Sequence, residues 1–125
     1  MPLRFHDHLY IFATIAFTVY GQLILKWRMV QLGEMPIASA EKFKFLITAV
    51  FDPAIFSGFV AAFLASLAWM AAMTKFELSY AYPFMSLNFV IVLVLSAWLL
   101  HEPLTMNKTI GILLIIVGTI IASRP

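Results

Sequence analysis

An uncharged run from Ser79 to Leu100 constrains the fold of this chain more than any other feature of its sequence. The run contains 22 consecutive residues without Asp, Glu, Lys or Arg. At about 1.5 Å of rise per residue, a helix of this length extends about 33 Å, which is enough to cross a hydrocarbon core of about 30 Å. We therefore expect a membrane-spanning helix, in which the polar residues of the run lie at defined depths.

Composition indicates that lipid is the solvent for the whole chain. Of its 125 residues, 63% are hydrophobic and 11% are charged, and the mean hydropathy is +0.98. Soluble domains carry about 25% charged residues, and a chain this short cannot bury so much apolar surface in one core. The net charge of +2 is too small and too scattered to predict nucleic acid as a partner. There is no cysteine, which excludes a disulfide framework and a thiolate metal site.

Four apolar segments predict an all-α integral membrane protein, in which residues 1–125 form a single four-helix domain. The expected transmembrane helices cover residues 9–29, 54–73, 79–100 and 105–123. Residues 74–77 make a tight connection, so we expect the second and third spans to be antiparallel neighbours. Four helices of this length can hardly enclose a substrate path alone, so we expect at least a dimer.

The connection between the first and second spans has a helical segment of its own. Gly33 and Pro36 end the first helix, and a helix-start pattern, Ser-Ala-Glu-Lys, opens the segment 40–51. We interpret this segment as an interfacial amphipathic helix that lies on the membrane surface. The alternative is that it forms early turns of the second span, interrupted at Asp52-Pro53. The second span is rich in Ala, Gly and Ser, which predicts close helix packing rather than chemistry.

A polar stripe runs along the first span. Its members are spaced by four residues, which places them on one face of a helix: Thr14, Thr18, Gln22 and Lys26. An unsatisfied amide in hydrocarbon costs several kcal/mol, so we predict that Gln22 lines a cavity or a helix–helix contact. The threonines have a simpler explanation, because they can bond to carbonyls of their own helix, and Lys26 can extend to the headgroups.

The third span carries polar and aromatic residues next to a proline. Pro83 removes a backbone donor in the first turns, which predicts a helix kink there. Such a bend frees carbonyls that a ligand can use, and Ser86 and Asn88 follow within two turns. We predict that these two residues bind substrate, and that Tyr80 and Tyr82 offer it flat rings with polar tips. A hydrogen bond from Asn88 to a neighbouring helix is the alternative.

The last span predicts a contact between subunits. Thr105 is placed to cap its helix, and Gly111 and Gly118 lie seven residues apart, on one face. Glycines on one face let helix backbones approach closely, so we predict that this face packs in a dimer. Five Lys or Arg residues lie on one side of the predicted membrane domain and three on the other. This difference slightly favours both termini outside the cytoplasm and is compatible with insertion in either direction.

Two stretches of the second half resemble a known family. YAYPFMSLNFV and LLHEPLTMNKTIGILLIIVGTII resemble the small EamA-like members of the drug/metabolite transporter superfamily, as does YGQLILKW in the first span. The nearest similarity is to the four-helix flippase subunits that move undecaprenyl-phosphate aminoarabinose across the inner membrane for lipid A modification. The small multidrug resistance exporters are more distant, and Thr18 replaces their membrane-embedded glutamate in the frame set by Gly21 and Lys26.

The resemblance implies a flippase that moves a polyisoprenyl-phosphate-linked (amino)sugar or a similar glycolipid across the bacterial inner membrane. Its partners would be membrane lipids, the lipid-linked sugar and a similar small subunit, identical or different. In this function Lys26 could hold the phosphate as a point charge, and Gln22 could join the polar residues of the third span around the sugar. Glu102 could pair with Lys108 or a loop lysine, or with an amino group on the sugar.

Neither a cofactor nor an enzymatic activity is expected. The chain has no glycine-rich phosphate loop, and no span pairs a nucleophile with a base. His6, Asp7 and His8 lie together near the N-terminus, but they lack the further ligands that a metal ion needs.

Two other functions stay open. A small exporter of a metabolite or cationic drug is disfavoured, because no span contains a carboxylate to bind a proton and a cation in turn. A non-transporting scaffold subunit of a membrane glycosyltransferase system is the other alternative.

Overall fold

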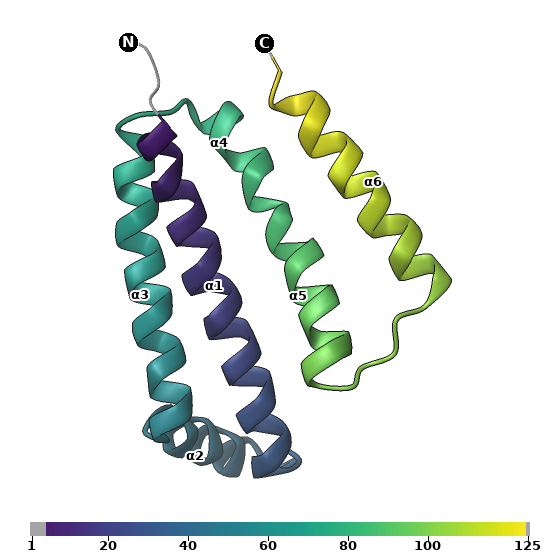
Figure 1. Ribbon diagram of the computed structural model, residues 1–125. Coiled ribbons are helices and arrows are strands. Elements are labelled where there is room, and N and C mark those ends of the chain that lie inside the picture. The colour runs from purple at the N-terminus through teal and green to yellow at the C-terminus, as the bar shows by residue number, and fades with distance from the viewer. Residues whose placement is uncertain (1–4, 125) are drawn as a thin grey trace.

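The computed structural model describes residues 5–124, and within this range the chain is entirely helical apart from turns and connections (Figure 1). The helices are α1 (Phe5–Leu32), α2 (Ser39–Val50), α3 (Pro53–Met73), α4 (Leu78–Met85), α5 (Leu87–Leu99) and α6 (Met106–Ala122). Helices α4 and α5 follow one another directly and act as one long segment. The two ends of the described chain lie at the same end of the molecule (Figure 1).

The helices have the length and composition of a multi-pass membrane protein. Within the described residues, three stretches are long and apolar enough to cross a membrane: His6–Leu32, Pro53–Met73 and Leu78–Leu99. Helix α6 is also apolar but has only 17 residues. The prediction of an all-helical membrane protein is therefore confirmed, whereas the count of four spans stays a prediction.

Helices α1 and α3 form the most extensive pair in the structure, lying side by side in antiparallel directions (Figure 1). Close packing is possible because α3 presents small residues to α1, and Gly58, Ala61, Ala65 and Ala72 are all buried. The two backbones are close at Gly21, where an added Cβ atom would lie 3.1 Å from the carbonyl oxygen of Gly58. The expected packing role of small residues in this span is thus confirmed.

A buried apolar cluster fixes α4 to the α1–α3 pair. It is centred on Ile11, Ile15, Val19, Ala72, Phe76 and Ala81. These residues come from α1, the end of α3, the α3–α4 connection and the beginning of α4. Leu87, Ile91, Val92 and Leu95 of α5 pack against the same cluster, so the α4–α5 segment contacts α1 beyond its first turns.

Helix α2 is a separate element and not the beginning of the second span. It ends at Val50, a turn follows at residues 51–52, and α3 starts at Pro53. Figure 1 shows α2 lying crosswise at the end of the α1–α3 pair. It leaves large apolar side chains exposed, including Phe43 and Leu46, as an interfacial helix would. Its location at a membrane surface stays a prediction.

The third apolar segment is interrupted close to its proline. The interruption falls at Ser86, three residues after Pro83, where α4 ends and α5 begins. The amide of Ser86 donates to the carbonyl of Pro83 at 3.0 Å, and the amide of Phe89 donates to the carbonyl of Ser86 at 3.0 Å. These tight turns replace the regular helical bonds locally. The Thr119 hydroxyl of α6 also donates to the Pro83 carbonyl, at 3.4 Å.

Helix α6 packs on α4 and α5, at the outer edge of the molecule (Figure 1). The Thr105 hydroxyl accepts a hydrogen bond from the Lys108 amide at 3.2 Å, which confirms Thr105 as the cap of this helix. Gly111 and Gly118 face open space, since an added Cβ atom at either position would meet no atom within 4 Å. They contact no other helix within this chain, and their role in a dimer stays a prediction.

Candidate functional site

The main concave feature of the described chain is a groove of about 710 Å³ between α1, α3 and the α4–α5 segment. Along α3 it extends from Ile55 to Met70, which corresponds to about 22 Å at the helical rise of about 1.5 Å per residue. Its walls are mostly apolar and aromatic. The polar side chains that line it are Thr14, Thr18, Gln22, Ser66, Tyr82, Ser86 and Asn88. None of the lining residues is Asp, Glu, Lys, Arg or His.

The structure brings four of the predicted binding residues into this groove: Gln22, Tyr82, Ser86 and Asn88. A regular helix would place Ser86 and Asn88 about 200° apart, on opposite faces. Ser86 itself keeps helical dihedral angles (φ −60°, ψ −24°), and both residues nevertheless line the groove. The interruption after Pro83 therefore lies within the polar lining, and a bend of the helix at Pro83 stays a prediction.

Asn88 is the one groove residue whose polar atom is buried and unsatisfied in residues 5–124. Its Oδ1 atom is inaccessible to solvent and has no hydrogen-bond partner. By contrast, the Thr14 hydroxyl donates to the Tyr10 carbonyl at 2.8 Å, and the Ser66 hydroxyl donates to the Ala62 carbonyl at 3.1 Å. The alternative role of Asn88, a hydrogen bond to a neighbouring helix, is not fulfilled by this oxygen.

Tyr80 lies away from the groove, in the apolar cluster. Its hydroxyl is 3.1 Å from His8 Nε2, and its ring stacks on Phe76 with a centroid distance of 5.5 Å. Tyr80 and Tyr82 are two residues apart on α4, which separates them by about 200° around the helix. The two side chains therefore leave α4 on opposite sides: Tyr82 lines the groove, and Tyr80 packs against the apolar cluster.

Lys26 and Glu102 lie close together outside the groove. The Lys26 ammonium is 4.0 Å from Glu102 Oε1, and both side chains are partly exposed. Lys26 is one helical turn beyond Gln22 and lines a second, smaller hollow of about 350 Å³. Lys108, an alternative partner for Glu102, instead donates to the carbonyl of Pro103 at 3.0 Å.

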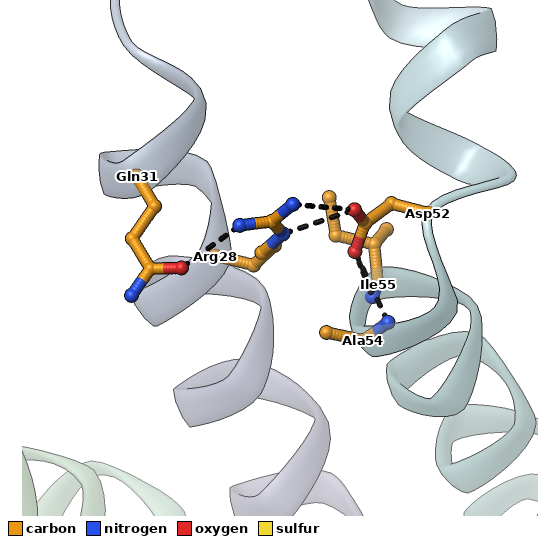
Figure 2. Close-up of polar contacts among 5 residues, drawn as sticks. All are labelled: Arg28, Gln31, Asp52, Ala54 and Ile55. Carbon is orange, nitrogen blue, oxygen red and sulfur yellow. Dashed lines mark hydrogen bonds and ion pairs between the residues drawn. The ribbon is translucent and has the colours of Figure 1, made fainter.

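An ion pair that the sequence did not predict joins α1 to the beginning of α3 (Figure 2). Asp52 Oδ2 accepts from Arg28 Nε at 2.9 Å and also lies 2.9 Å from Arg28 Nη2. Asp52 Oδ1 accepts from the amides of Ala54 and Ile55 at 3.0 and 3.4 Å and so caps α3. Asp before Pro at a helix start is a capping signal, but nothing in the sequence singles out Arg28 as its partner.

The second span contributes more to the groove than packing. Trp69, Ser66 and Phe59 of α3 line it, and the Trp69 ring meets the Tyr82 ring edge-on at a centroid distance of 6.2 Å and an interplanar angle of 75°. The sequence interpretation, which assigned this span to packing alone, missed them. Single polar or aromatic residues among many small ones give little indication of which helix face they occupy.

Comparison with known proteins gives relatives that align over most of their length. The chain is 33% identical over 124 residues to the probable 4-amino-4-deoxy-L-arabinose-phosphoundecaprenol flippase subunit ArnF of Erwinia tasmaniensis, covering 94% of each protein. It is 32% identical over 107 residues to the protein of the same name from Enterobacter sp. strain 638, covering 84% of each. It is also 27% identical over 115 residues to the probable flippase subunit ArnE of Aeromonas salmonicida, covering 92% of this chain and 95% of that protein.

No solved structure matches this chain. The profile of the EamA-like transporter family, however, aligns with residues 9–124, which is nearly the whole sequence. With the helical membrane fold and the similar flippase subunits, this match confirms the resemblance seen in the sequence: the chain belongs to the EamA-like transporter family.

Proposed function

We propose that this chain is a subunit of an inner-membrane flippase that moves a polyisoprenyl-phosphate-linked sugar, with an amino sugar as the leading candidate. The observation that carries the proposal is the polar but uncharged lining of a long groove, which includes no Asp, Glu, Lys, Arg or His. A sugar needs hydrogen-bond donors and acceptors during its passage, whereas a proton-coupled cation exporter needs an embedded acid. The names of the similar ArnF and ArnE proteins support the same substrate class.

The groove suits a substrate with a polar head and a long apolar tail. Gln22, Ser86 and Asn88 offer amides and a hydroxyl to the sugar, and the groove walls are mostly apolar. The tail would stay in the lipid while the head moves along the groove. This arrangement avoids moving the whole substrate through protein, so small subunits are sufficient to form the path.

Lys26 would hold the phosphate at one end of this path. Its ammonium lies one helical turn beyond Gln22 and has Glu102 as its neighbour at 4.0 Å. An exposed pair at this distance contributes little, about 0–1 kcal/mol, so a phosphate can displace the carboxylate from Lys26. Glu102 would then be available to an amino group on the sugar, as the sequence suggested.

A second subunit would complete the site, because the groove is open along one side. Gln22, Tyr82 and Phe89 line it and remain exposed in the single chain. The glycine-bearing face of α6 also stands free. We infer that the working unit is a dimer of this chain with itself or with a similar small subunit.

A leaflet assay tests the function directly. The protein is reconstituted in vesicles that contain a polyprenyl-phosphate-linked aminopentose in both leaflets, and a membrane-impermeant amine-reactive reagent is added outside. Without flipping, only the outer-leaflet sugar reacts; with an active flippase, the inner-leaflet sugar also becomes labelled. If labelling stops at the outer-leaflet fraction for this chain, both alone and with a similar small subunit from the same genome, the proposal is wrong.

A triple variant separates transport from scaffolding. Gln22→Leu, Lys26→Leu and Asn88→Leu together remove the amides and the ammonium while leaving apolar side chains in lipid. We expect this variant to insert and to lose flipping. The control is Asn107→Leu, which removes an exposed amide in the first turn of α6, outside the groove. Full cellular function of the inserted triple variant would favour a scaffold subunit instead.

A further inference from the structure

The buried oxygen of Asn88 indicates how the groove distinguishes one head group from another. Among the side-chain atoms of residues 5–124, Asn88 Oδ1 is buried and has no hydrogen-bond partner. A buried acceptor that lacks a donor is unfavourable, and the cost is recovered when a ligand supplies one. Asn88 also lines the groove, and the torsion that turns an Asn amide is broad, so a rotation of this side chain can present the oxygen to a ligand there.

An aromatic pair lines the same groove. Trp69 of α3 and Tyr82 of α4 both line it and meet edge-on, with ring centroids 6.2 Å apart. Edge-on contact leaves ring faces available, and aromatic faces attract the C–H groups of a sugar as well as a cation. Trp69 comes from α3, which packs against α1, and Tyr82 comes from α4, so the pair joins two of the helices that form the groove.

The residues that line the groove cannot form an ion pair with a charged ligand. No Asp, Glu, Lys, Arg or His is among the groove residues, so neither a carboxylate nor an ammonium on the ligand finds an opposite charge there. A carboxylate on the head group would lose its hydration with no cation in the lining to offset the cost, and the negative faces of the aromatic rings would repel it. A head group with N–H or O–H donors meets an acceptor and aromatic faces instead.

We propose that Asn88, Trp69 and Tyr82 form a head-group subsite, in which Asn88 Oδ1 accepts a hydrogen bond from the ligand and the two rings hold its sugar. The subsite selects uncharged or amino sugars that carry a donor, and it rejects sugars that carry a carboxylate. This inference rests on the proposed flippase function, and it assigns to Trp69 and Asn88 a part in the choice of substrate.

Trp69 provides its own signal for a binding test. Trp27 and Trp98 are exposed and lie outside the groove, so Trp27→Phe and Trp98→Phe leave Trp69 as the single tryptophan. This protein is placed in lipid nanodiscs and titrated with three probes of equal chain length. They are a decyl-phosphate-linked aminopentose, a decyl-phosphate-linked uronic acid and decyl phosphate alone. We expect the first probe to change the Trp69 emission and to bind about ten-fold or more tightly than the other two.

Variants of Asn88 decide whether it accepts or donates. Asn88→Asp keeps only acceptor oxygens in the same shape at a pH where the carboxyl is ionised, and Asn88→Leu removes both functions. We expect Asn88→Asp to bind the aminopentose probe at least as well as the parent, and Asn88→Leu to bind it about ten-fold more weakly. Loss of binding in both variants would mean that Asn88 donates, and unchanged binding in both would remove it from the subsite; either result overturns the proposal.

The rings are tested by Trp69→Leu and Tyr82→Leu, with binding followed by isothermal titration because the fluorophore is lost in the first. Each should weaken the aminopentose probe about three- to ten-fold and leave decyl phosphate unchanged. Equal weakening of both probes would show a general packing defect and contradict a sugar subsite. If all three probes bind equally to the parent while the leaflet assay detects flipping, the subsite fails and the flippase function stands.

Discussion

Arg28 and Asp52 connect the end of α1 to the beginning of α3 through a single carboxylate whose two oxygens have different partners (Figure 2). Burial acts to raise the pKa of Asp52, but hydrogen bonds from Arg28, Ile55 and Ala54 outweigh it and hold this pKa below its ordinary value of 3.8. Arg28 is itself oriented by Gln31, whose Oε1 accepts from Nη1 at 2.9 Å. The pair therefore fixes how two long helices meet.

The first prediction concerns acid stability. Because the folded pKa of Asp52 is depressed, its stabilisation is complete above the ordinary value of 3.8 and is lost as the pH falls through the lower folded value. Asp52→Asn keeps an acceptor for the α3 cap but loses the ion pair, so its melting temperature should be lower than the parent's near neutral pH. The difference should shrink below about pH 4, where the parent carboxyl is protonated too. Thermal melting in detergent at several pH values measures this, and a constant difference would contradict it.

A second variant separates the cap from the ion pair. Asp52→Ala removes both, so it should melt below Asp52→Asn, by about 4 °C if the cap is typical of a small domain. Arg28→Lys keeps the charge but cannot place two nitrogens on one oxygen, and it should fall between the parent and Arg28→Ala. Equal melting of Asp52→Asn and Asp52→Ala would show that the cap contributes nothing.

Replacing glycine by alanine should lower stability at Gly21, in the contact between α1 and α3, and raise it at Gly111, which faces open space. Gly21→Ala would place its Cβ atom 3.1 Å from a backbone carbonyl of α3, which forces the helices apart. Overpacking of this kind costs about 1–3 kcal/mol. Gly111→Ala enters open space and should gain up to about 1 kcal/mol from helix propensity. Denaturation of both variants in the same mixed micelles checks the sign; a stabilising Gly21→Ala would mean that the helices are less close.

Much of the helical arrangement follows from the sequence, because uncharged length, breakers and caps are local signals. The Asp52-Pro53 start of α3 and the Thr105 cap of α6 are examples, since each depends on residues within one turn. The exact site of the interruption after Pro83 was less predictable. The missing amide frees a carbonyl, but the turn at Ser86 also involves Thr119, which lies on another helix.

The site was predictable only in part, because residue type does not give helix rotation. Gln22 was predicted to line a cavity or a helix–helix contact, and it lines the groove, since a polar amide in lipid must face something. Tyr80, expected to contact substrate, packs in the core, whereas Trp69 lines the groove although its span was assigned to packing. Aromatic residues are equally at home in both places, so only the neighbours that tertiary packing supplies can decide between them.

The free face of α6 predicts an assembly defect without a folding defect. Gly118→Leu adds a large side chain where no atom of the same chain lies within 4 Å, so the subunit itself should melt as the parent does. If this face packs in a dimer, the leucine prevents close approach and dissociation should rise at least about ten-fold, the cost of roughly 1.4 kcal/mol of overpacking. Energy transfer between labelled subunits in vesicles measures it. Unchanged transfer would place the dimer contact elsewhere.

The Lys26–Glu102 pair predicts competition between a carboxylate and a phosphate. Glu102→Gln removes the competitor, so decyl phosphate should bind about 1.4- to five-fold more tightly, as expected for an exposed pair worth about 0.2–1 kcal/mol. Lys26→Gln should weaken the same probe, and Lys26→Arg should restore it. The control is Lys75→Gln at the opposite end of the bundle. If Lys75→Gln weakens binding as much as Lys26→Gln does, the effect is one of general charge and not of a site.

No Asp or Glu lines the groove, so we do not expect the protein to exchange protons for a cation. A single substitution can introduce the missing carboxylate. Thr18 lines the groove, where Thr18→Glu introduces a carboxylate into low-dielectric surroundings that can hold either a proton or a cation. We expect this variant, and neither the parent nor the control Thr74→Glu, to bind a hydrophobic quaternary ammonium in vesicles with an affinity that falls as the pH is lowered. Thr74 follows α3 and is exposed, so its carboxylate would remain in water. Proton-driven uptake of the ammonium by the parent would show that coupling does not need an acid in this groove, and it would favour a cation exporter over a flippase.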